Sequence, residues 1–373
     1  MAIATSFDRD LSSLLRRRPD CAWLRQDLAL FGWGTNTRID PGVGPDRYRR
    51  AREIAAEANS IVFASFTFDE DEPGSVLMLP DITLRVDPWG KQFVEGDESM
   101  LPLERDFPEP PMGDVADPDT DGWSKGAATA MGAIERGTVE KVVLSRAVDL
   151  EFGGPVPVHT VLARLASAQP SSHIYLIEGL VGSSPELLIQ LRSGAIRSVS
   201  LAGSSDRTVP GSIDTLSTPK MTTEHALAAD SVEEALALHS ANLSRRASEV
   251  ATFGDIHHLA TSFTGSALPG TGVTDLLRSL HPTAAVAGTP TGAALQMIRK
   301  IERHDRGRYA SPIGWLDGSG DGEFAIALRC GLVSGNSVRL YSGAGLVKGS
   351  QPAEEFEETE IKLKPMMQAL GLA

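Results

Sequence analysis

Near its C-terminus the chain places two carboxylates and a lysine at helical spacing. Glu355, Glu358 and Lys362 are three and four residues apart, so on a helix they are surface neighbours that project together. Two carboxylates can hold a hard cation, and an ammonium group beside them can hold an anion. Alternatively, acidic residues in a first helical turn complement the helix dipole and are solvated. That role is expected for the other glutamates of the run: Glu354, Glu357 and Glu360.

Two further residues could transfer protons. Lys141 begins an apolar run, and a dry pocket there would favour the neutral amine, a general base. The alternative role is that of a sheet-edge lysine that guards against aggregation. Glu186 precedes an apolar strand pattern, where its surroundings could keep the carboxyl group protonated as a general acid. A structural glutamate at the start of a strand is the alternative for Glu186.

Arg329 and Gly203 are candidates for contact with an anionic ligand. In the strand pattern 324–329, two alanines share the face of Arg329 and leave room for bidentate binding of a carboxylate. An arginine on a solvated strand face is the alternative. Gly203 ends another strand pattern, and a glycine there lets a ligand approach the backbone amides closely.

Length and charge limit the classes of function. The chain has 373 residues and a formal net charge of -14, which argues against nucleic acid or an anionic membrane as the main partner. Cys21 and Cys330 have no spacing typical of a zinc site or a disulfide framework, so a reducing cytoplasm is expected. Neither a secretory signal nor a membrane-spanning run is expected.

The elements that must position these residues follow from periodicity. We expect an N-terminal β/α layer over 1–100, a Pro/Asp-rich connection over 101–122 and a catalytic region over 123–373. Hairpins predominate over βαβ units, so antiparallel sheets with helices outside are expected. The catalytic region is expected to contain helices at 123–135, 222–249 and 291–303, a strand at 141–150, and hairpins at 174–200 and 324–340 that turn at 193–194 and 335–336.

Taken in order, motifs over about 123–370 resemble those of the chorismate-utilising enzymes. This family includes isochorismate synthase, salicylate synthase, anthranilate synthase and aminodeoxychorismate synthase. The motifs that carry the resemblance are Lys141-Val-Val-Leu-Ser-Arg146, Ser184-Pro-Glu186-Leu, Leu201-Ala-Gly203-Ser, Glu224-His225, His258-Leu-Ala-Thr261, His281-Pro-Thr283, Gly314-Trp315, Gly322-Glu323, Arg329-Cys330, Gly343-Ala-Gly345 and Glu355-Phe-Glu-Glu358-Thr.

The resemblance implies an α/β fold (α+β) like that of anthranilate synthase component I. This is a single large domain in which antiparallel sheets face one another around a buried site, with helices packed outside. It also implies a Mg²⁺ ion held directly by Glu224 and Glu358 and through water by Glu355. A magnesium ion that keeps several waters and is shared between a few carboxylates and a substrate is chemically reasonable.

The implied substrate is chorismate, which has two carboxylates. By resemblance, the ring carboxylate would meet the metal, the amides at Gly203 and Ser204, and Lys362. The enolpyruvyl carboxylate would meet a second group of residues: Arg329, Gly343 and Tyr309. Two more residues match positions that line the pocket near the ring: His258 and Thr261.

Lys141 separates the activities within the family, because members that form isochorismate carry lysine here and members that transfer an amine typically carry glutamine. The resemblance therefore implies that Lys141 activates water for attack at C2 while Glu186 protonates the departing C4 hydroxyl. Ala202 supports this, since aminodeoxychorismate synthases typically have a nucleophilic lysine there. The implied enzyme is a monomeric isochorismate synthase that serves menaquinone or siderophore biosynthesis and needs no glutaminase subunit.

Two other functions stay open at this point. Salicylate synthase uses the same first step and then eliminates pyruvate. The second function is that of a paralogue that binds chorismate with little turnover. Met221 suggests it, because in the family a carboxylate normally stands at this position, one turn before Glu224, and supports the metal's water shell. Loss of such an outer partner weakens metal binding without abolishing it.

Overall fold

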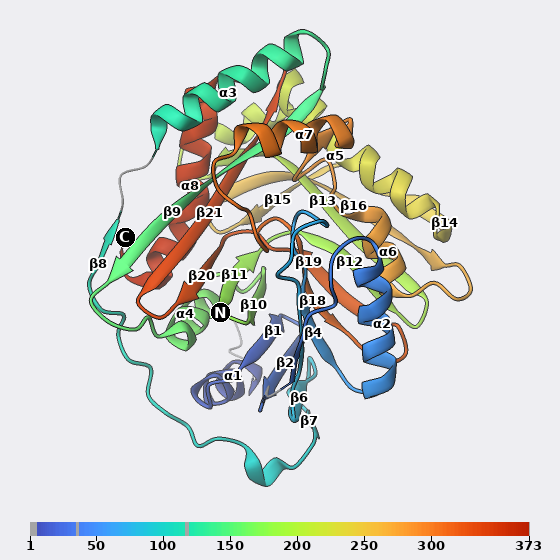
Figure 1. The fold of residues 1–373 in the computed structure, drawn as a ribbon, viewed down its shortest axis with the longest axis vertical. Coiled ribbons are helices and arrows are strands. Elements are labelled where there is room, and N and C mark those ends of the chain that lie inside the picture. The colour runs from blue at the N-terminus through green and yellow to red at the C-terminus, as the bar shows by residue number, and fades with distance from the viewer. Residues whose placement is uncertain (1–5, 35–36, 116–118, 373) are drawn as a thin grey trace.

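The computed structural model describes residues 6–34, 37–115 and 119–372 (Figure 1). Within these residues, two antiparallel sheets of 11 and 10 strands form one domain, here called the first and the second sheet. The expected fold class is thereby confirmed.

The strands of the first sheet are β1 (Cys21–Arg25), β2 (Leu28–Trp33), β6 (Ile82–Val86), β7 (Gln92–Glu95), β8 (Gly113–Val115), β9 (Lys141–Phe152), β10 (His173–Ile177), β11 (Leu180–Ser184), β17 (Gly288–Thr289), β20 (Cys330–Ser334) and β21 (Ser337–Val347). Their spatial order is β17-β9-β21-β20-β11-β10-β1-β2-β6-β7, with β8 also paired to β9.

The strands of the second sheet are β3 (Thr37–Ile39), β4 (Val62–Ser65), β5 (Val76–Leu79), β12 (Leu187–Arg192), β13 (Ala195–Asp206), β14 (Ser240–Arg245), β15 (Glu249–Phe253), β16 (Ile256–Ala267), β18 (Pro312–Leu316) and β19 (Gly322–Ile326). Their spatial order is β14-β16-β13-β12-β19-β18-β4-β5-β3, with β15 also paired to β16.

Helices cover the outer faces of both sheets (Figure 1). Strands such as β1 are apolar on both faces because both faces are buried. In β1, Trp23 packs in the core between the sheets, whereas Ala22 and Leu24 pack in the core under the outer helices. The helices are α1 (Ser6–Arg16), α2 (Asp46–Ala58), α3 (Thr120–Glu135), α4 (Val158–Ala168), α5 (Pro219–Ala237), α6 (Val273–Leu280), α7 (Thr291–Ile301) and α8 (Pro352–Leu370), with short 3-10 segments at Glu98–Met100 and Ser212–Ser217.

Two of the points at which the chain passes from one sheet to the other are adjacent. The chain leaves β11 and enters β12 at Glu186, and it leaves β19 and enters β20 just before Arg329. Backbone hydrogen bonds tie the crossings together, because Ile326 N donates to Glu186 O (3.2 Å) and Ser183 N donates to Arg329 O (3.1 Å). Two candidate site residues are thereby held side by side between the sheets.

These crossings correct the expected hairpins. The turns at 193–194 and 335–336 are confirmed, but 174–200 holds two hairpins in different sheets, and 324–340 likewise spans both sheets. The strand that was expected to continue to Arg329 ends at Ile326, and Arg329 has a positive φ of 49°. Arg329 therefore reaches the space between the sheets from a connection and not from a strand face.

The expected helix over 222–249 was wrong beyond its middle. Helix α5 ends at Ala237, and β14 and β15 follow as strands paired to β16. Ser240 and Asn242 interrupt the helical pattern, and Asn242 has a positive φ of 54°. Pairing with the long neighbouring strand overrides the helix propensity of this segment.

Strands from residues before 100 lie in both sheets, and a buried carboxylate fastens them to the rest. Glu323 is fully buried on β19, where it accepts a hydrogen bond from Trp23 Nε1 (3.1 Å) and pairs with Arg25 (3.0 Å). In the connection, the described residues 101–112 form no helix or strand, and 116–118 lie outside the described residues. No helix in the described part of the chain is long and apolar enough to cross a bilayer.

Candidate active site

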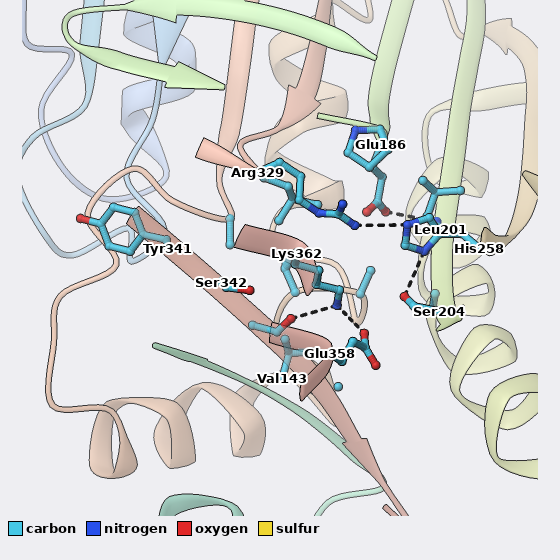
Figure 2. A pocket seen from close by; sticks show the side chains of 18 of the residues that line it. Val143, Glu186, Leu201, Ser204, His258, Arg329, Tyr341, Ser342, Glu358 and Lys362 are labelled. Carbon is cyan, nitrogen blue, oxygen red and sulfur yellow. Dashed lines mark hydrogen bonds and ion pairs between the residues drawn. The ribbon is translucent and has the colours of Figure 1, made fainter. Parts of the chain in front are cut away.

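A cavity lies between the two sheets, beside these crossings (Figure 2). Its lining comes from both sheets, from α5 and from α8. The sequence-predicted residues that line it are Glu186, Gly203, Ser204, Glu224, His258, Tyr309, Arg329, Gly343, Glu358 and Lys362. Three other predicted residues do not line it: Lys141, Thr261 and Glu355.

Glu186 provides a neutral carboxyl group in this cavity. Burial raises its pKa from 4.5 to about 8, although a backbone bond from Leu201 and the charges of Lys141 and Lys362 oppose the shift. Leu201 N donates to Glu186 Oε1 over 3.4 Å. Because this pKa lies above neutral pH, Glu186 carries a proton that it can donate.

Arg329 is a buried cation without an anionic partner among the described residues. Its side chain is directed at His258, and Arg329 NH2 lies 3.2 Å from His258 Nε2 (Figure 2). Since arginine only donates, Nε2 accepts and Nδ1 carries the ring proton, which it donates to Ser204 Oγ over 3.0 Å. Burial lowers the pKa of Arg329 to about 10, so it stays charged at neutral pH and can receive an anion.

His258 is neutral in this chain of contacts. Burial, followed by the charges of Arg329 and Lys362, lowers its pKa well below the ordinary value. The strand β13 bulges beside it, because Ala202 pairs with Leu259 and Ser204 pairs with His258, which leaves Gly203 as the extra residue. Gly203 has φ of 71°, a conformation that favours glycine.

Lys141 lies behind the cavity wall and pairs with Glu224. The lysine is fully buried at the start of β9, and its Nζ is 3.2 Å from Glu224 Oε1, on α5. This ion pair lacks hydrogen-bond geometry, so Nζ has no hydrogen-bond partner among the described residues. Gly345 on β21 makes the approach possible, since a Cβ there would lie within 3.0 Å of Glu224 Oε1 and 3.1 Å from Lys141 Cε.

Lys362 and Glu358 form a second pair, on α8 at the other side of the cavity (Figure 2). Lys362 Nζ lies 2.5 Å from Glu358 Oε1 and donates to Gly343 O over 2.9 Å. Burial alone would raise the pKa of Glu358, but Lys362, Lys220 and a hydrogen bond from Ser204 together leave that pKa lowered. Glu358 is therefore a carboxylate at neutral pH.

Glu355 faces away from the cavity toward a third lysine. It is buried on α8, and Lys220 Nζ lies 2.6 Å from its Oε1. Burial and the neighbouring charge of Glu358 raise the pKa of Glu355, against the attraction of Lys220.

Lys220 is attracted electrostatically to all three candidate cation ligands. Burial lowers its pKa, but attraction to nearby carboxylates leaves it raised; in order of strength these are Glu355, Glu358 and Glu224. An ammonium group thus already lies among the three carboxylates, whose oxygens are the donors that Mg²⁺ prefers. As placed, no three acidic, histidine or cysteine side chains of the described chain form a metal cage, and each candidate carboxylate is paired with a lysine.

The remaining candidates have supporting positions. Thr261 Oγ1 and His225 Nε2 form a hydrogen bond of 2.8 Å. Because His225 follows Glu224 on α5, this bond holds the helix in place, although Thr261 does not line the cavity. Tyr309 stacks on Tyr341 with ring centroids 5.1 Å apart, which holds its ring against the cavity wall.

Sequence reasoning missed several lining residues. Arg306 is buried and donates to the carbonyl oxygens of Val143 and Val286 (2.8 Å each), so it supports the wall and also lines it. Its ion pair with Glu302, four residues before it, does not by itself indicate burial, and the two carbonyl oxygens come from other parts of the chain. The other missed lining residues include Ala285, Val286, Leu328, Tyr341 and Ser342.

Comparisons with known proteins give a matching family and several named relatives. The family described as chorismate binding enzyme matches residues 92–371. Isochorismate synthase MenF of Bacillus subtilis is 38% identical over 68% of this chain, and the aligned part spans 56% of that relative's length. The salicylate biosynthesis isochorismate synthase of Pseudomonas aeruginosa is 30% identical over 95% of this chain and 86% of its own.

A solved structure also matches almost the whole chain. MenF of Escherichia coli, a menaquinone-specific isochorismate synthase, superposes with a TM-score of 0.82 at 26% identity. The match covers 99% of this chain and 93% of that one.

Proposed function

This chain belongs to the chorismate-binding enzyme family, and on that premise we propose that it is a Mg²⁺-dependent isochorismate synthase. The observation that carries the proposal is that a neutral acid, Glu186, lines the cavity, while a fully buried lysine, Lys141, lies behind the cavity wall against the lining residue Glu224. The names of the relatives connect this activity with menaquinone and with salicylate biosynthesis, so the product would feed menaquinone or siderophore formation.

The charges of the cavity suit a dicarboxylate. Arg329 is a buried cation without a carboxylate partner in the described chain, and an incoming carboxylate would compensate it. Lys362, at the other side, would contribute a second cation. Chorismate has two carboxylates, with the enolpyruvyl group assigned to Arg329 and the ring carboxylate to Lys362.

In the proposed reaction, a water molecule adds to ring C2 and the C4 hydroxyl leaves as water. Lys141, as its neutral amine, accepts a proton from the water that forms a bond to ring C2, the ring double bonds shift, and the bond between C4 and its hydroxyl oxygen breaks. Glu186 donates its proton to that oxygen, which leaves as water. The product, isochorismate, has the composition of chorismate, so neither ammonia nor a glutaminase subunit is required.

The candidate cation ligands fit Mg²⁺ by their chemistry. Glu224, Glu355 and Glu358 supply only carboxylate oxygens, and the ammonium of Lys220 among them is a cation already in place. Bound Mg²⁺ would neutralise the ring carboxylate and stabilise developing charge. The residues that hold the ring against the acid and base would be Lys362 and the backbone at Gly203.

The proposal is tested by incubating the purified protein with chorismate, with and without Mg²⁺ and ammonia. Chromatography and NMR should detect isochorismate only when Mg²⁺ is present, and ammonia should not change the product. Anthranilate or aminodeoxychorismate would refute the proposal. Salicylate with pyruvate would identify a salicylate synthase, and binding without a product would identify the paralogue that Met221 suggests.

Gly345→Ala should separate Lys141 from Glu224. The added Cβ has no room beside Glu224 Oε1, so the variant should lose turnover by roughly tenfold or more and about 1–3 kcal/mol of stability. Isochorismate formation and urea unfolding measure the two effects. Gly292→Ala is the control, because a Cβ there meets nothing within 4 Å. Equal activity in both variants would mean that the Lys141 and Glu224 contact is dispensable.

A further inference from the structure

Lys220 lies between a buried and an exposed carboxylate at the first turn of α5. Its Nζ is 2.6 Å from Glu355 Oε1 and 3.9 Å from Glu354 Oε2. The Glu355 side chain is 3% exposed, whereas that of Glu354 is 69% exposed. The lysine can therefore exchange a buried partner for a solvated one by a small movement of a flexible side chain.

Lys220 approaches Glu355 from outside the active-site cavity. It lines a separate cleft of about 580 Å³ together with Met221, Glu354 and Glu355. This outer cleft shares Ser204 and Glu358 with the active-site cavity, which Lys220 does not line. Glu358 thus forms a wall between the two spaces, and the outer cleft leads from the surface to the candidate cation ligands.

The contact between Lys220 and Glu355 neutralises charge without good hydrogen-bond geometry. Glu355 Oε1 has no hydrogen-bond partner within the described chain despite its short distance from the ammonium group. Met221, the next residue, adds no acceptor that could hold the lysine on the inner side. A divalent cation, which attracts a carboxylate more strongly than a single charge does, can displace such a partner.

We propose that Lys220 competes with the divalent cation for Glu355, and that binding of the ion moves Lys220 from Glu355 to Glu354 in the outer cleft. The inference rests on the proposed function in that Glu355 and Glu358 are taken as cation ligands. Lys220 is a positioning residue in this account. It keeps the buried carboxylates neutralised and sets how much free cation the protein needs.

The test measures binding of Mn²⁺, as a spectroscopic probe for Mg²⁺, to the full chain without chorismate. Electron paramagnetic resonance of free Mn²⁺ should show that Lys220→Met binds the ion about tenfold more tightly than the parent, because a charge-assisted contact no longer has to be broken. Calorimetric titration with Mg²⁺ should give the same ratio. Lys125→Met, which removes an exposed lysine paired with Asp121, should leave the affinity unchanged.

Thermal unfolding supplies a readout that is independent of binding fits. In chelator, Lys220→Met should melt below the parent because Glu355 loses its partner, and saturating Mg²⁺ should remove the difference. Lys220→Gln should behave in the same way if the methionine variant folds poorly. Equal or weaker Mn²⁺ binding in both variants would overturn the inference. Because chorismate is absent, this outcome is separate from any failure to form isochorismate.

Discussion

Replacing Glu186 by glutamine should lower isochorismate formation by roughly 10²–10⁴-fold, the range that a positioned general acid contributes. The side chain keeps its size but has no acidic proton to give to the departing hydroxyl. The parent should itself lose activity as the pH rises through about 8, where burial places the pKa of Glu186. Initial rates across pH 6 to about 10, followed by chromatography, measure both effects.

The same substitution should stabilise the protein at alkaline pH. Burial raises the pKa of Glu186 from 4.5 to about 8, so the folded state binds this proton more tightly than the unfolded chain does. The resulting stability is fully present below 4.5 and is lost as the pH rises through about 8. Glutamine does not ionise, so its free energy of unfolding near pH 9 should exceed the parent's by on the order of a few kcal/mol, with little difference near pH 5.

A matched control separates this effect from a general loss of charge. Glu140→Gln removes an exposed carboxylate next to Lys141 in the sequence and should change neither the rate nor the pH dependence of urea unfolding. If Glu186→Gln kept the parent's turnover, Glu186 would not be the acid. If its alkaline stability matched the parent's, the carboxyl group would not be neutral in the folded protein.

Helical spacing predicted the part of the site on α8, because the geometry there is local. Glu355, Glu358 and Lys362 do project from one end of this helix, and Glu358 and Lys362 are in contact. Spacing did not predict that Glu355 is buried and lines only the outer cleft, whereas Glu358 also lines the active-site cavity. That difference depends on Lys220, which comes from another helix.

The residues at the sheet crossings show why the rest was harder to predict. Strand patterns indicated apolar runs around Glu186 and Arg329, but periodicity does not tell to which sheet a strand belongs. The close approach of the two residues depends on hydrogen bonds between segments that lie more than a hundred positions apart, as Ser183 N to Arg329 O does. The prediction of helix for the segment after α5 was wrong for a related reason. Pairing with β16, and not local propensity, made this segment a strand.

Replacing Lys141 by methionine should also lower turnover by roughly 10²–10⁴-fold, because the variant lacks the amine that takes the proton of the attacking water. The substitution has a second effect, on stability. It removes the ion-pair partner of Glu224, whose side chain is only 12% exposed, and so should cost about 3 kcal/mol of unfolding free energy in chelator. Urea unfolding and isochorismate formation measure these quantities.

Magnesium should return part of that stability if Glu224 is a cation ligand. With the lysine removed, Glu224 has lost its ion-pair partner and can pair with the added ion, so the stabilisation by saturating Mg²⁺ should be larger in Lys141→Met than in the parent. Lys125→Met should show neither the loss nor the larger response to Mg²⁺. If Lys141→Met lost activity but was not stabilised more strongly by Mg²⁺, Lys141 would still be the base but Glu224 would not be a cation ligand. If Lys141→Met retained turnover, Lys141 would not be the base.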